Sequence, residues 1–150
     1  MGGSTYSRFN LWFSFKGELA SGTHNFSSGG DTFKIALYTA NPYTTSSTVK
    51  VVTNEVSSAG GSNYTAGGNT LTSQTVTATT ATTAIDFADT TWSSATFTAA
   101  FAAIYNSTDS DKLVVVLDFG GNKTATNGDF TISFPDPSTP SNAIISITSS

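Results

Sequence analysis

The segment Lys112-Leu113-Val114-Val115-Val116-Leu117-Asp118-Phe119 decides the fold class, because its apolar residues occupy both faces of an extended chain. Side chains alternate between the two faces of a β-strand, so a strand that is apolar on both faces must be covered on both sides. We therefore predict that residues 112–119 form a strand in the middle of a sheet. The Gly120-Gly121 pair is predicted to end that strand.

Shorter strand signals surround this segment. In residues 32–38, Phe33, Ile35 and Leu37 face one way and Lys34 the other, which predicts a strand that ends before Pro42. Further strands are predicted around Trp92 and Phe97 and at 101–105, 129–134 and 143–147, with a hairpin over 71–87 that turns at 79–83. About eight short strands separated by turn signals predict a mainly β fold, either an antiparallel β-sandwich or a jelly-roll-like barrel.

The N-terminal stretch 7–20 is predicted to form the one helix of the chain. Phe9, Trp12, Phe13 and Leu19 fall near one helical face, and Gly22 follows as a stop signal. The expected organisation is an N-terminal arm and helix over 1–24 and a single β-sandwich domain over 25–150. In the simpler interpretation the helix caps a sheet; in the alternative one, its aromatic residues dock on a partner.

Two loop segments follow the strand at 32–38. Residues 44–53 form either a loop or a short edge strand, and residues 57–69 form a loop with four glycines and Tyr64 in its middle. Loops of this length are usually functional or mobile. Aromatic side chains in such loops and in the N-terminal arm are candidates for contact with a partner. These candidates are Tyr6, Phe9, Trp12, Phe13, Phe15, Tyr43 and Tyr64.

Composition limits the functions open to this chain. Only 11% of its 150 residues are charged, the net charge is −4, and there is no cysteine. An acidic balance excludes binding to a nucleic-acid backbone or an anionic membrane surface, and the lack of cysteine excludes disulfides. The apolar run at 11–15 is too short for a signal peptide, and no segment is long enough to span a bilayer, so we expect folding in a cytoplasm.

Groups that carry out chemistry are scarce. His24 is the only histidine, and no Gly-x-Ser-x-Gly motif accompanies it, so we interpret it as a loop histidine bonded to backbone or to a neighbour. One histidine without cysteine excludes ordinary zinc sites. Asp109 with Asp111, or Asp86 with Asp89, offer oxygens for calcium, but they are more simply turn acids. We expect no metal, no cofactor and no catalytic residue.

Carbohydrate binding remains open at this stage. Aromatic side chains stack on sugar rings, and Trp92, Tyr64 and Tyr43 are the candidates for such stacking. Glycoside hydrolysis would need two carboxylates at a fixed separation, and no pair of acids can be placed at that separation from the sequence. The glycine pairs at 67–68 and 120–121 lack the spacing of a phosphate-binding loop.

The order of segments resembles a group of small virion proteins of tailed bacteriophages. The residues that carry the resemblance are Gly22-Thr23-His24-Asn25-Phe26, residues 31–38, Tyr64-Thr65-Ala66-Gly67-Gly68, Ile85-Asp86-Phe87, Thr91-Trp92, Ile104-Tyr105-Asn106 and Leu117-Asp118-Phe119-Gly120.

The resemblance implies a non-enzymatic particle component. The expected form is a capsid cement or decoration protein on the capsid exterior, made in the host cytoplasm, with the major capsid protein and copies of itself as partners. The alternatives are a neck, tail or fibre component, or a carbohydrate-binding adsorption module.

Overall fold

The computed structural model describes residues 3–4, 8–11, 13–136, 138–139 and 143–148, with side chains from Ser14 onward. The elements are, in chain order, β1 (Gly3–Ser4), β2 (Arg8–Leu11), α1 (Phe13–Ala20), β3 (Phe33–Tyr38), β4 (Asn69–Thr70), β5 (Thr75–Ala78), β6 (Thr82–Asp86), β7 (Thr90–Asn106), β8 (Lys112–Ile132) and β9 (Ile145–Thr148).

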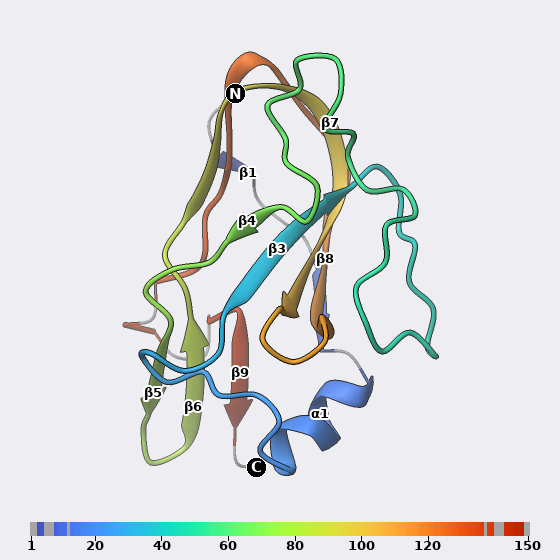
Figure 1. The fold of residues 1–150 in the computed structure, drawn as a ribbon. Helices are drawn as coiled ribbons and strands as arrows, with labels where there is room; N and C mark the ends of the chain where they lie inside the picture. Colours follow the sequence, from blue (N-terminus) through green and yellow to red (C-terminus); the bar gives the residue numbers. More distant parts are fainter. Residues whose placement is uncertain (1–2, 5–7, 12, 137, 140–142, 149–150) are drawn as a thin grey trace.

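Two open sheets make up the fold (Figure 1). The larger sheet has the order β1-β8-β7-β3-β4, with β2 also paired to β8, and the smaller sheet has the order β5-β6-β9. All pairings are antiparallel except the short pairing of β1 with β8. The predicted mainly β, antiparallel sandwich with one N-terminal helix is confirmed, and the alternative of a closed barrel is wrong.

The hairpin of β7 and β8 is the longest feature of the larger sheet (Figure 1). Leu113 to Leu117 are all buried, as the two-faced apolar pattern predicts. However, Gly120-Gly121 does not end the strand. Phe101 pairs with Asp118 and Ala99 with Lys123, so residues 119–122 bulge opposite a single residue of β7, and pairing then resumes. Both glycines have positive φ, which a bulge accommodates without ending the strand.

The prediction of a helix over residues 7–20 is wrong in its first part. Residues 8–11 form β2, which pairs antiparallel with Val115–Asp118 of β8, and only Phe13–Ala20 are helical. The physical reason is long-range, because the outer edge of β8 would otherwise leave backbone hydrogen-bonding groups without a protein partner. The segment assigned to a separate arm therefore contributes strands to the larger sheet.

Aromatic side chains join the two sheets. The ring of Phe33 on β3 lies 5.8 Å from that of Phe87, which follows β6 in the smaller sheet. Phe26 stacks on Phe33 at 4.3 Å between centroids, and Phe134 lies 6.0 Å from Phe87. Each fully buried phenylalanine contributes up to about 3 kcal/mol to folding. This core fixes residues 24–32, which pass from α1 to β3 along its edge.

A long loop, residues 39–68, follows β3 (teal and green in Figure 1). It forms isolated bridges, Tyr38 with Glu55 and Val49 with Lys112, so of the two predicted forms of residues 44–53 the structure shows the loop. The amide of Val56 donates to the carbonyl of Leu37, which attaches the loop to the strand. The loop therefore attaches to β3 on the side that pairs with β4, beyond the end of that pairing.

Candidate functional site

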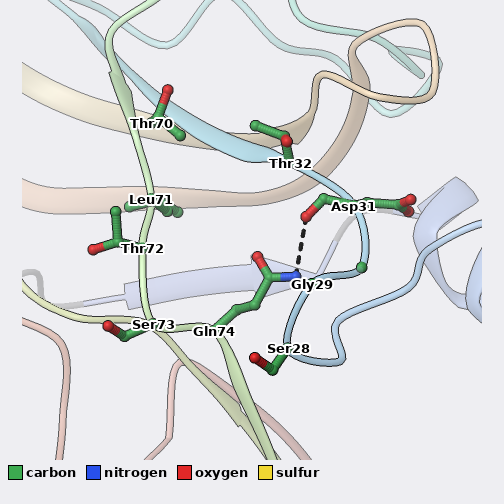
Figure 2. Close-up of a pocket in the computed structure, with 10 residues that line it drawn as sticks. Ser28, Gly29, Asp31, Thr32, Thr70, Leu71, Thr72, Ser73 and Gln74 are labelled. Atoms are coloured by element: carbon green, nitrogen blue, oxygen red, sulfur yellow. Dashed lines mark hydrogen bonds between the residues drawn. The ribbon is translucent and has the colours of Figure 1, made fainter.

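A shallow polar hollow of about 340 Å³ lies where the connection into β3 meets residues 70–74 (Figure 2). Its wall combines hydroxyl, amide and backbone groups with apolar surface, from residues 28–32 on one side and 70–74 on the other. The side-chain amide of Gln74 reaches across and donates to the carbonyls of Asp31 and Ser27, at 3.0 and 2.9 Å. The Asp31 carboxylate points away from Gln74 (Figure 2). Hydrogen bonding is thus the chemistry that this hollow offers.

Behind the hollow, four side chains form a continuous polar network. The Asp31 carboxylate accepts hydrogen bonds from the Asn25 amide and from Nδ2 of Asn106, both at 2.8 Å. Asn106 Nδ2 also lies 3.1 Å from Nδ1 of His24, and His24 Nε2 lies 3.0 Å from a carboxylate oxygen of Glu18. His24 and Asn106 are buried. The network therefore links α1, the connection into β3 and the end of β7.

The surroundings of His24 determine which ring nitrogen carries the proton. Asn106 Oδ1 accepts the backbone amides of Thr108 and Asp109, so its side-chain amide is oriented with Nδ2 toward the imidazole. An NH₂ group donates, so Nδ1 of His24 must accept and Nε2 must donate to Glu18. The imidazole thus faces a carboxylate and an amide, whereas a catalytic triad would place a nucleophile at one of its nitrogens.

This orientation predicts the tautomer of His24. Long-range ¹⁵N–¹H NMR spectra of the folded protein are expected to show Nε2 protonated and Nδ1 without a proton, and the assignment is unambiguous because the chain has one histidine. In Asn106→Asp the donor to Nδ1 is lost, so the preference for this tautomer is expected to weaken. A spectrum of the wild-type protein with the proton on Nδ1 would contradict the network.

A second cluster of polar side chains joins separate parts of the long loop to one another. Glu55 accepts hydrogen bonds from the Tyr64 hydroxyl and the Gly67 amide, and its other oxygen lies 2.6 Å from Lys50 Nζ. The side chains of Lys50 and Glu55 are 9% and 7% exposed, so this ion pair is well shielded from water.

Tyrosines extend the cluster along the loop. Tyr43 donates to the hydroxyl of Tyr38, and Tyr38 donates to the carbonyl of Val51. The Tyr105 hydroxyl donates to the carbonyl of Gly67 at 2.6 Å. Hydrogen bonds from tyrosine hydroxyls and to the Glu55 carboxylate therefore hold the glycine-rich part of the long loop in place. The sequence alone indicated only the length of this loop.

Burial of these tyrosines predicts a loss of stability at alkaline pH. Burial is the main cause that raises the pKa of Tyr43 to about 12, and it raises the pKa of Tyr38, Tyr64 and Tyr105 above the ordinary value of 10. Above pH 10 the unfolded chain loses these protons first, so the free energy of unfolding falls as pH rises. The slope is at most about 1.4 kcal/mol per pH unit for each tyrosine.

Absorbance of tyrosinate and denaturant unfolding, both followed from pH 8 upward, measure this effect. The four tyrosines are expected to ionise together with unfolding. Ionisation of all of them near pH 10 in a chain that stays folded would show that they are not buried as described.

The structure places three of the seven proposed contact residues inside the chain. Phe15, Tyr43 and Tyr64 are buried, with 1%, 7% and 3% of their surface exposed, so their side chains contribute to this chain's own core. The backbone places Phe9 in β2 and Phe13 at the start of α1, and the side chains of both lie outside the described part. Tyr6 and Trp12 lie outside the described residues altogether.

The three candidates for stacking on sugar rings are buried as well. Trp92 is 3% exposed, and its ring stacks on that of Tyr64 at 6.1 Å, with Phe97 and Phe130 packed around it. Together with the burial of Tyr43, this leaves none of the three rings at the surface.

The acidic pairs considered for calcium are not part of a larger cluster of possible metal ligands among the described residues. Within the described residues, no group of three or more histidine, aspartate or glutamate side chains is arranged to hold a metal ion. Asp89 accepts the amide of Phe134, which lies 45 residues further along the chain, so its partner is not a local turn. Asp86 is buried, and loss of hydration is the main cause that raises the pKa of its carboxyl.

Comparison with known proteins gives no relative. The chain matches no family model, no curated protein and no solved structure. Among the described residues, no helix has the length and apolar character needed to cross a bilayer.

Four residues hold both polar clusters together: sequence reasoning missed Lys50 and Asn106, and it considered Glu18 and Glu55 as acids without placing them. Glu18 lies six residues before His24 in the chain, so its contact was within reach of local reasoning. Asn106 lies 82 residues from His24, and no local pattern connects the two.

Proposed function

We propose that this chain is a non-enzymatic structural component of a tailed-bacteriophage virion, and specifically a capsid cement protein. The observation that supports it most is the use of the scarce ionisable side chains. His24, Glu18, Asp31, Lys50 and Glu55 all bond within the chain and stabilise its own loops. Besides charged side chains such as Asp111 and Asp129, the described surface offers strand edges, hydroxyls and a few apolar side chains to other molecules.

These features suit a protein that binds across joints between capsid subunits. A ligand that binds the assembled shell, but not its separated subunits, stabilises the shell by mass action. Shape, backbone hydrogen bonds and a few apolar contacts are sufficient for such binding, and no nucleophile is required. The proposed partners are the major capsid protein and copies of this chain on the capsid exterior.

A neck, tail or fibre position would use the same surface features, and the test below separates it from a cement role. The carbohydrate-binding alternative has less support, since its three stacking candidates are buried.

Capsids assembled with and without this chain test the proposal. Those without it are expected to lose their contents at lower temperature and in low salt, and adding back purified protein is expected to restore resistance. Capsids that lack it and withstand both treatments equally well would overturn the cement role.

A further inference from the structure

The smaller sheet has an unprotected free edge at β5. Among the described residues, this strand pairs with β6 on one side only, and all four of its own residues are exposed. Residues 69–85, which contain β5, carry no charge and no proline. Free edges in natural sheets are normally protected by such residues or covered, because unpaired backbone groups recruit other strands. The β5 edge therefore has the features of a pairing surface.

The turn between β5 and β6 shows which backbone groups face outward. The Thr79 amide donates to the Thr82 carbonyl, which makes residues 79 and 82 a hydrogen-bonded pair. Hydrogen-bonded and non-hydrogen-bonded pairs alternate along an antiparallel ladder. Thr77 and Ala84 are thus a hydrogen-bonded pair, whereas the amides and carbonyls of Val76 and Ala78 point away from β6 toward the free edge.

An apolar surface accompanies this edge. Val76 lies opposite Ile85, and Ile147 lies opposite Thr83, so both share the face of the smaller sheet that carries the buried Ile85. Val76 and Ile147 are nevertheless 48% and 45% exposed. Next to Ile147, a hollow of about 390 Å³ opens against Phe15 and Leu19 of α1. The apolar face that carries Ile85 thus extends beyond the buried core to the exposed side chains of Val76 and Ile147.

We propose that two copies of this chain pair through their β5 strands. The strands run antiparallel about a two-fold axis normal to the sheet, which joins the smaller sheets into one of order β9-β6-β5-β5-β6-β9. In the register that pairs the outward groups, Val76 lies opposite the partner's Ala78. The two Thr77 residues then face each other across the axis.

Charge makes this edge a favourable place for two copies to meet. The chain has a net charge of −4, so most contacts between copies bring like charges together, whereas the segment 69–85 is neutral. The same strand supplies both halves of the interface, so each Val76 meets an alanine and neither strand introduces a charge. The inference deepens the proposed structural role by naming the surface through which copies associate, and it rests on that role for its biological meaning.

A cysteine at the proposed axis tests the geometry directly. The chain has no cysteine, and Thr77→Cys places one opposite its copy in a non-hydrogen-bonded pair, where side chains are closest. We expect oxidised Thr77→Cys to form a disulfide-linked dimer at least tenfold faster than Val52→Cys, whose site is 78% exposed on the long loop. Equal rates for the two variants would overturn the pairing.

The oligomeric state of the purified protein provides the second measurement. Sedimentation of the wild type over a dilution series is expected to show a monomer–dimer equilibrium. Val76→Lys should weaken it at least tenfold, and Val52→Lys should leave it unchanged, with circular dichroism confirming that both fold. A wild type that stays monomeric at its highest concentration would overturn the inference. A dimer that does not bind capsids would overturn only the proposed cement role.

Discussion

Gly68→Ala is expected to destabilise the protein by about 4 kcal/mol or more, the largest effect of any single substitution considered. Gly68 has a φ of +75°, and a Cβ there would lie 1.8 Å from the carbonyl oxygen of Ile35 and 2.8 Å from Cα of Ala36. Both atoms belong to the backbone of β3, so no side-chain rotation relieves the overlap. Either the end of the long loop or the strand itself must move.

Gly60→Ala is the matched control for this substitution. Gly60 has a similar φ of +69°, but a Cβ there meets no atom within 4 Å. Its expected cost is about 1 kcal/mol, from backbone strain alone. Denaturant unfolding of the two variants measures the difference, which reports the close approach of the loop to β3. Equal costs would contradict that approach.

Glu55→Gln is expected to cost about 3 kcal/mol, because it leaves Lys50 buried without a counter-charge. The glutamine oxygen can still accept from the Tyr64 hydroxyl and the Gly67 amide, so those hydrogen bonds survive. The new amide nitrogen, however, faces Lys50 Nζ where a carboxylate oxygen stood at 2.6 Å. The substitution therefore isolates the contribution of the ion pair.

Adding Lys50→Met to the Glu55→Gln variant tests whether the unpaired charge on Lys50 causes the loss of stability. The double variant removes the unpaired charge and keeps an apolar side chain of similar length, so its stability is expected to return to within about 1 kcal/mol of the wild type. If the double variant were as unstable as Glu55→Gln alone, the loss would come from packing rather than from an unpaired charge.

Patterns with a period of two predicted most of the architecture. They located β3, the β5–β6 hairpin and the buried first half of β8, because alternation and β-branched residues act locally. They did not reveal β2, since its conformation comes from pairing with Val115–Asp118 of β8, more than a hundred residues away. Gly120-Gly121 was interpreted as a stop because a bulge and a strand end share the same residue preferences.

The polar clusters were less predictable than the strands. Local reasoning placed His24 just after the helix and favoured a hydrogen-bonding role, but its partners proved to be the side chains of Glu18 and Asn106. Tyr64 was expected in a flexible, glycine-rich loop, yet its hydroxyl donates to Glu55 and accepts from the amide of Leu37. Both differences come from contacts between distant segments, which propensity and spacing do not encode.

Binding of the purified protein to capsids that lack it, compared with binding to unassembled capsid subunits, is the most direct test of a cement role. Saturable binding to the assembled capsids, together with a rise in their disruption temperature and little binding to free subunits, is the predicted result. Binding to neither form, or equal binding to both, would contradict the proposal that this chain stabilises an assembled shell.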